Sequence, residues 1–206
     1  MGGIFLGFDP GGLGRFGAAL VSDSELLLQT VDSADEAFRW AKHHLRGRSP
    51  RAAGIDTLLH WSMSGGGWRP ADHRLRTRHR VGVLAPNALR GAMVIGGMAL
   101  AMCLQEEWSG ILLNETHPKV LFETLFAERY RAETLSDAVT KFARRTRLKV
   151  ATPVGEHEFD ALISAWATRE GLSGHWSDLV SNDSDLIFPA GKRVHYFWPK
   201  VGDSGQ

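Results

Sequence analysis

The chain has 206 residues, of which 43% are hydrophobic and 23% are charged. Its 24 basic and 23 acidic side chains leave a formal net charge of +1. These proportions exclude a collagen, a coiled coil and a disordered acidic chain, and the length suits a single domain. A single cysteine, Cys103, excludes an intrachain disulfide and a cysteine-based zinc cluster, so we expect a reducing, cytoplasmic setting.

Three short apolar segments open the chain and predict an antiparallel meander. Strands are expected over 4–8, 16–21 and 25–31 because each segment is apolar and ends at turn-forming residues. The connections are Gly11-Gly12 and the polar tripeptide 22–24, both suited to hairpin turns.

A helix and a fourth strand follow the meander. Ser33 is expected to cap a helix that runs to about residue 45, with Glu36 completing a capping box. Residues 52–56 predict a short buried strand. The next stretch, 57–86, is long, polar and rich in glycine and arginine, which is typical of a functional or mobile loop.

The second half of the chain is predominantly helical. The uncharged segment 91–105 is too short to span a membrane, so it predicts a buried helix rather than a membrane segment. The expected elements are a helix over about 87–107, a strand over 111–115, helices near 118–128, 134–147 and 156–170, and a β hairpin from strands at 186–188 and 194–198.

This order of elements predicts an α/β fold. The sheet is expected to be mixed and five-stranded, with the three antiparallel strands of the meander followed by two parallel strands, and with helices on both faces. We expect residues 1–206 to form one domain, with an insertion at about 57–86 and a short C-terminal β tail at about 184–198. Sheets of this kind bind ligands at the carboxyl ends of their strands.

Three aspartates occupy positions where chemistry is expected. Asp9 ends the first strand and is held extended by Pro10, and Asp56 ends the fourth strand. Asp160 lies three residues after His157, so both side chains project from one face of the last major helix. The alternative for Asp9 is a simple hairpin turn, and for Asp56 an Asx turn or a helix cap.

Glu115 and His117 close the fifth strand. They either join the aspartates or cap the following helix, and the sequence leaves both interpretations open. If several carboxylates converge, their mutual repulsion must be offset by a hard cation. Mg²⁺ or Mn²⁺ would serve, because two such ions activate a water and stabilise the leaving oxygen in phosphodiester hydrolysis.

Basic residues form three blocks, at 39–51, 69–80 and 141–149. Such blocks commonly coat a solvated surface, but three of them in a chain of balanced charge leave room for a phosphate-binding face. The candidate phosphate-binding residues are Arg69, Arg74, Arg76 and Lys119.

The motifs resemble the ribonuclease H-like superfamily, and in particular its Holliday-junction resolvase branch. The strand FLGFDPGG over 5–12 is similar to the opening strand of those proteins, and His157-x-x-Asp160 to their last catalytic helix. From residue 4 to about 198 the chain is most similar to an uncharacterised family of predicted ribonuclease H-like nucleases. The matching residues are Asp56; Arg69, Asp72 and Arg76; Glu115, His117 and Pro118; and Asp160, Ala161 and Leu162.

The resemblance implies a metal-dependent nuclease acting on DNA or RNA. Asp9 would bridge two metal ions, Asp56 and Asp160 would each complete one, and His157 or Glu115 would position water or the leaving group. The chain departs from this pattern at Asp56, where resolvases usually have the longer Glu. The shorter side chain would shift the geometry of the metal site or the choice of metal ion. His157 suits Mn²⁺ better than Mg²⁺.

The sequence also bears on two other functional classes. A non-catalytic module that binds nucleic acid or a protein partner would keep the fold and stack Trp61, Trp68 or Trp108 on bases. A sugar-kinase or actin-like ATPase is disfavoured because it needs two such domains, and the first hairpin is not repeated. The sequence leaves open the choice between DNA and RNA and the formation of a homodimer.

Overall fold

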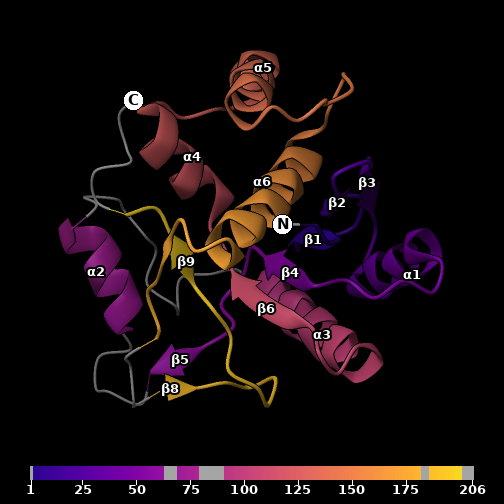
Figure 1. Cartoon of the computed structure of the whole chain (residues 1–206), viewed down its shortest axis with the longest axis vertical. Helices are drawn as coiled ribbons and strands as arrows, with labels where there is room; N and C mark the ends of the chain where they lie inside the picture. Colours follow the sequence, from indigo (N-terminus) through magenta and orange to yellow (C-terminus); the bar gives the residue numbers. More distant parts are fainter. Residues whose placement is uncertain (1, 63–68, 79–90, 182–185, 201–206) are drawn as a thin grey trace.

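The computed structural model describes residues 2–62, 69–78, 91–181 and 186–200, and its central element is a mixed five-stranded sheet (Figure 1). The strands are β1 (Phe5–Asp9), β2 (Phe16–Val21), β3 (Leu26–Val31), β4 (Ala52–Ile55) and β6 (Leu112–Glu115). Their order in the sheet is β3-β2-β1-β4-β6. The predicted fold class is therefore confirmed.

The register of the sheet places several candidate site residues at one edge. β1 pairs antiparallel with β2 and parallel with β4, and Phe8 lies opposite Ile55. β4 in turn pairs parallel with β6, where Ile55 lies opposite Glu115. Because β1, β4 and β6 run in the same direction, Asp9, Asp56 and Glu115 all fall at the carboxyl ends of their strands.

Helices cover both faces of the sheet and enclose two hydrophobic cores (Figure 1). On one face lie α1 (Ala34–Leu45) and α3 (Gly91–Glu107), with Trp40 and Leu104 in the core. On the other lie α4 (Pro118–Phe126), α5 (Leu135–Thr146) and α6 (Glu156–Leu172), with a short 3-10 turn over Ala132–Thr134. In the core on that face, the buried rings of Phe122, Phe142 and Phe159 come from α4, α5 and α6 respectively.

The backbone of α6 lies directly on the sheet because three strands carry glycine beneath it. A Cβ atom at any of these positions would collide with a helix carbonyl oxygen, so any other residue would force the helix away. The distances from the ideal Cβ position to the carbonyl oxygen are 1.9 Å from Gly17 to His157, 1.9 Å from Gly7 to Ala161 and 2.3 Å from Gly54 to Ser164. These contacts fix the depth of α6, and with it the positions of His157 and Asp160.

The expected N-cap of α1 is present. The Ser33 hydroxyl accepts a hydrogen bond from Glu36 N at 3.2 Å. The Glu36 carboxylate, however, accepts from Asp32 N at 3.0 Å rather than from the cap residue itself. The helix start is thus as predicted, with the reciprocal bond moved by one residue.

The stretch expected to be a loop contains regular structure. Strand β5 (Trp61–Ser62) and helix α2 (Pro70–Arg78) lie within it. The buried apolar side chains of α2 are Ala71 and Leu75, which pack into the core on the α6 side. Two buried apolar positions in nine residues give little periodicity, which explains why the sequence did not indicate a helix here.

The expected C-terminal hairpin is wrong, because its two strands pair with other segments. β8 (Leu186–Ile187) pairs antiparallel with β5, and β9 (Phe197–Trp198) pairs with β7 (Ser177–Asp178). The predicted start of α3 at about residue 87 lies outside the described residues. Within the described ranges, no helix is both long and apolar enough to cross a membrane.

Candidate functional site

Asp9 and Asp56 are neighbours at the carboxyl edge of the sheet. Asp56 N donates a hydrogen bond to Phe8 O at 2.9 Å, so the residue after β4 stays beside the end of β1. Asp9 is 3% exposed, whereas the side chain of Asp56 is 21% exposed. The pair therefore combines a buried carboxylate with one that solvent reaches.

Helix α6 brings two further candidate residues to this edge. His157 Nδ1 lies 2.6 Å from Asp9 Oδ2. Asp160 is 2% exposed and accepts a hydrogen bond from the Tyr130 hydroxyl. Lys119 Nζ lies 3.9 Å from Asp160 Oδ2, so a cation from α4 faces the same carboxylate.

The carboxylates of this group act on each other electrostatically. Burial raises the pKa of Asp9 well above its ordinary value, and the charge of Asp56 raises it further. Burial, followed by the charges of Asp9 and Asp56, likewise raises the pKa of Asp160. Lys119 lowers both pKa values but does not offset these effects. Burial and mutual repulsion thus both disfavour the charged forms of Asp9 and Asp160.

The donor chemistry of this cluster fits a hard divalent cation. Carboxylate oxygens are the ligands that Mg²⁺ and Mn²⁺ prefer, and a bound cation would relieve the repulsion that raises these pKa values. In the present geometry one carboxylate oxygen of Asp9 is hydrogen-bonded to His157, and one of Asp160 to Tyr130. Among the described residues, no group of three or more His, Cys, Asp or Glu side chains is placed so that it could hold a metal ion.

Glu115 lies in a separate, buried ion network. Its Oε2 accepts hydrogen bonds from Leu59 N at 2.8 Å and Arg69 Nη1 at 2.9 Å, and lies 2.8 Å from His60 Nδ1. Arg69 also donates to both oxygens of Asp72, each at 2.8 Å. Burial alone would raise the pKa of Glu115, but the charges of Arg69 and His60 outweigh it and hold the pKa well below its usual range.

This network fastens the region after β4 to the sheet. Arg69 directly precedes α2, Asp72 lies in the first turn of that helix, and Glu115 ends β6. Their side chains are at most 1% exposed. The Arg-x-x-Asp element and the glutamate therefore meet in space, and in this geometry the Arg69 guanidinium faces protein carboxylates.

His117 lies between the network and the aspartates. Its Nδ1 is 3.6 Å from Asp56 Oδ1 and its Nε2 is 4.0 Å from Glu115 Oε1. Burial would lower its pKa, but the interaction with Asp56 and the charge of Glu115 raise it instead. Although His117 precedes α4, its side chain makes no capping hydrogen bond, so it joins the acidic residues.

The other predicted phosphate-binding residues occupy different environments. Lys119 is 55% exposed and also contacts Glu156. Arg76 is exposed on α2, whereas Arg74 is partly buried and donates to Leu179 O. Lys119 therefore lies beside the aspartate cluster, and Arg74 and Arg76 lie on the helix that Arg69 anchors.

Two residues of the site were not singled out from the sequence. Tyr130 lies in a polar connection between α4 and α5, where no periodic pattern marks it, yet its hydroxyl contacts Asp160. His60 follows two buried leucines and is itself 0% exposed. Its only sequence signal is a polar residue directly after an apolar pair, which is too common to be informative.

The sheet order, with α6 packed across β1, β2 and β4, defines a ribonuclease H-like fold. The solved structure of Thermus thermophilus RuvC is similar, with a TM-score of 0.46 and 15% identity, covering 83% of this chain and 96% of that one. T. thermophilus RuvC in complex with a Holliday junction substrate gives a TM-score of 0.52 and 16% identity, covering 84% and 96%. The resemblance inferred from the motifs is thus confirmed at the level of the fold.

Comparison of sequences gives a narrower match. No protein-family model matches the chain. It is 37% identical over 90 residues to the mouse (Mus musculus) fibronectin type 3 and ankyrin repeat domains 1 protein, covering 40% of this chain and 25% of that protein. The human (Homo sapiens) counterpart is 36% identical over 89 residues, with the same coverage. The matched region is a quarter of the length of these curated relatives.

Proposed function

We propose that the chain is a divalent-metal-dependent nuclease that hydrolyses phosphodiester bonds of nucleic acid. The observation that carries this proposal is the grouping of Asp9, Asp56 and Asp160, two of them buried with raised pKa values. Burying carboxylates this close together is costly unless a cation or a proton offsets their charge. A metal site for phosphodiester hydrolysis would explain why the carboxylates are buried together, because the bound cation would offset their charge.

In the proposed mechanism, Asp9, Asp56 and Asp160 would hold Mg²⁺ or Mn²⁺. When bound, such ions supply an activated water and stabilise the developing charge on the leaving oxygen. His157 orients Asp9 through its Nδ1, and the Tyr130 hydroxyl orients Asp160.

Two further groups complete the proposed machinery. Lys119 is exposed and its Nζ lies 3.9 Å from Asp160 Oδ2, so it would draw a substrate phosphate toward the carboxylates. Glu115 acts as a positioning residue, because its contact with His117 restrains the histidine that faces Asp56. The Arg69 network in turn keeps Glu115 charged and fixed.

The test is a cleavage assay with Mn²⁺ on single-stranded DNA, duplex DNA, an RNA–DNA hybrid and a four-way junction. Asp9→Asn and Asp160→Asn keep side-chain size and the acceptor oxygen but remove the charge, so both should abolish cleavage. Asp137→Asn, on the exposed start of α5, is the matched control and should cleave as the wild type does. Unchanged cleavage by Asp9→Asn would refute the proposed site.

A second candidate function is a nucleic-acid- or partner-binding module without catalysis. It is favoured by the hydrogen bonds that His157 and Tyr130 already make to Asp9 and Asp160, since these partly satisfy the carboxylates without an ion. The stacking role expected of Trp108 is less suited, because its ring packs against Phe38 with centroids 6.0 Å apart, and Trp68 lies outside the described residues. Calorimetry that detects nucleic-acid binding but no Mg²⁺ or Mn²⁺ binding at millimolar concentration would select this function.

A further inference from the structure

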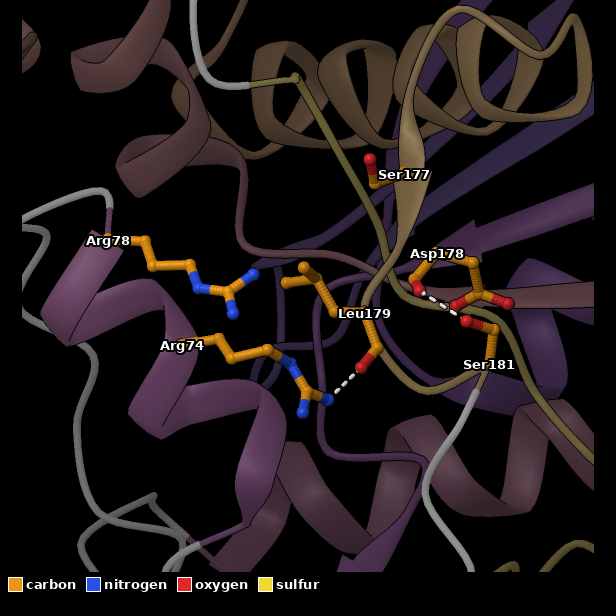
Figure 2. Close-up of a pocket in the computed structure, with 6 residues that line it drawn as sticks. All are labelled: Arg74, Arg78, Ser177, Asp178, Leu179 and Ser181. Carbon is orange, nitrogen blue, oxygen red and sulfur yellow. Dashed lines mark hydrogen bonds between the residues drawn. The ribbon is translucent and has the colours of Figure 1, made fainter.

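A cavity of about 500 Å³ lies between helix α2 and the segment around β7, in a part of the fold that the aspartate cluster does not use (Figure 2). We call it the α2 cavity. The residues that line it are Arg74, Arg78, Ser177, Asp178, Leu179 and Ser181. Its volume is within the range of sites that bind small ligands or parts of larger ones.

One wall of the α2 cavity is basic. Arg74 and Arg78 are four residues apart on α2, so their side chains leave the same face of the helix. Figure 2 shows both side chains extending from α2 toward the 177–181 segment, where Arg74 donates to Leu179 O. Arg78 is exposed, so its guanidinium is reachable from solvent.

Two acidic residues in the described part of this region have partners of their own. Asp72, the acid within α2, is held by Arg69 through two hydrogen bonds. Asp178 lines the cavity, but its Oδ1 accepts from the backbone N of Val180 and Tyr196, and its Oδ2 lies 2.9 Å from His195 Nδ1. Its carboxylate therefore stabilises the turn.

The opposite wall supplies small polar groups. Ser177 and Ser181 both line the cavity, and the Ser181 hydroxyl donates to Asp178 O at 3.0 Å. A serine hydroxyl that donates one hydrogen bond still has lone pairs, and it can rotate to donate to an anion instead. Arginine forks opposite hydroxyl groups form the usual environment of a bound phosphate in protein–nucleic acid contacts.

We infer that the α2 cavity binds a backbone phosphate of nucleic acid away from the bond that is cut. This inference rests on the proposed nucleic-acid substrate. A contact of this kind carries no sequence information but sets the register of the strand on the protein. The Arg69 network would then also help to position this phosphate contact, because it anchors the helix that carries Arg74 and Arg78.

The test is fluorescence anisotropy with labelled single-stranded, duplex and four-way-junction DNA, in EDTA so that no metal-dependent cleavage occurs. Arg78→Ala should weaken binding several-fold. It should also reduce the magnitude of the slope of log K against log salt by about 0.9 on duplex or about 0.7 on single strands, the value for one lost phosphate contact. Arg78→Lys keeps the charge and should keep the slope.

Arg39→Ala is the matched control, because it removes one arginine whose side chain is 65% exposed on α1, on the opposite side of the molecule from α2 in Figure 1. It should leave the slope unchanged. An unaltered slope for a folded Arg78→Ala protein overturns the inference, as does a wild type that binds none of the three probes. Millimolar inorganic phosphate at constant ionic strength should weaken DNA binding by the wild type but not by Arg78→Ala, because it competes with the backbone phosphate for the same cavity.

The outcomes separate this inference from the proposed catalysis. If wild type cleaves, Asp9→Asn does not, and Arg78→Ala keeps the wild-type slope, the nuclease stands and the α2 cavity is not a phosphate site. If Arg78→Ala shows the reduced salt slope and no protein cleaves DNA, the phosphate site in the α2 cavity is supported and the catalytic proposal fails.

Discussion

His157 Nδ1 lies 2.6 Å from Asp9 Oδ2, although 148 residues separate the two in sequence. The contact depends on how closely α6 sits on the sheet, because the His157 carbonyl oxygen occupies the space that a Cβ at Gly17 would need. His157 therefore holds one oxygen of a buried carboxylate in a defined direction. In the proposed metal site, this contact would orient Asp9 as a ligand.

We predict that His157→Ala lowers the affinity for Mn²⁺ by about 10–100-fold, the usual cost of losing a group that orients a ligand. Isothermal titration calorimetry measures it directly. His175→Ala is the control, since His175 is 68% exposed and pairs with Glu170 at the far end of α6. Equal Mn²⁺ affinity for the His157 variant and the wild type would show that this histidine does not act on the ligand.

The raised pKa of Asp9 predicts how the stability of the metal-free protein depends on pH. Between the ordinary value of 3.8 and the raised folded value, the folded state binds more protons than the unfolded state. This contribution to the free energy of unfolding is therefore fully present below the ordinary value and is lost as the pH rises through the folded pKa. Asp9→Asn does not titrate, so at neutral pH without metal it should be more stable than the wild type.

Added metal should make the wild type more stable than Asp9→Asn. Mn²⁺ at about 100 times its dissociation constant stabilises the wild type by about 2.7 kcal/mol, and the Asn variant gains little because it lacks the charged ligand. Thermal denaturation of both proteins from pH 4 to 8, with EDTA and with Mn²⁺, measures the two effects. A wild type that is more stable than Asp9→Asn in EDTA at neutral pH would contradict the burial of an uncompensated charge.

The parts of the fold that the sequence predicted are those that local pattern determines. Apolar strands ended by Asp9 and Asp56, and the Ser33 cap, follow from residue type and spacing alone. That the two aspartates meet follows from parallel pairing, which the order of strands and helices indicates. The depth of α6 depends on the glycines beneath it, which lie far from this helix in the sequence.

The parts that the sequence did not predict depend on distant partners. The pairing of β5 with β8 and of β7 with β9 joins segments more than 15 residues apart, and each strand is only two residues long. Arg69 is another case, because arginine in a polar, glycine-rich stretch is typical of solvent or a phosphate. Only the fold reveals that Glu115 and Asp72 surround it.

Arg69→Ala should destabilise the protein by about 3–5 kcal/mol, because it leaves the buried carboxylates of Glu115 and Asp72 without their cation. Arg129→Ala is the control: Arg129 pairs with Glu123 at 2.8 Å but is 70% exposed, so its loss should cost less than about 1 kcal/mol. Urea denaturation compares the two. Similar midpoints for both variants would mean that the buried network does not hold α2 to the sheet.

Gly7→Ala tests whether the site depends on the close packing of α6. The added Cβ would lie 1.9 Å from Ala161 O and 2.6 Å from Ala165 N, both backbone atoms, so the helix itself must move. Overpacking of this kind costs about 1–3 kcal/mol or more. Because Asp160 directly precedes Ala161, the same shift should also weaken Mn²⁺ binding.

Gly12→Ala separates this steric effect from the general effect of replacing glycine in the same region. Nothing lies within 4 Å of a Cβ at Gly12, so the free energy of unfolding should change by about 0.5 kcal/mol or less. Urea denaturation and Mn²⁺ calorimetry are measured on both variants. If Gly7→Ala were as stable as Gly12→Ala and bound Mn²⁺ equally well, the helix could not lie as deep on β1 as the contacts require. The position of Asp160 beside the other aspartates would then not depend on the glycine-lined surface beneath α6.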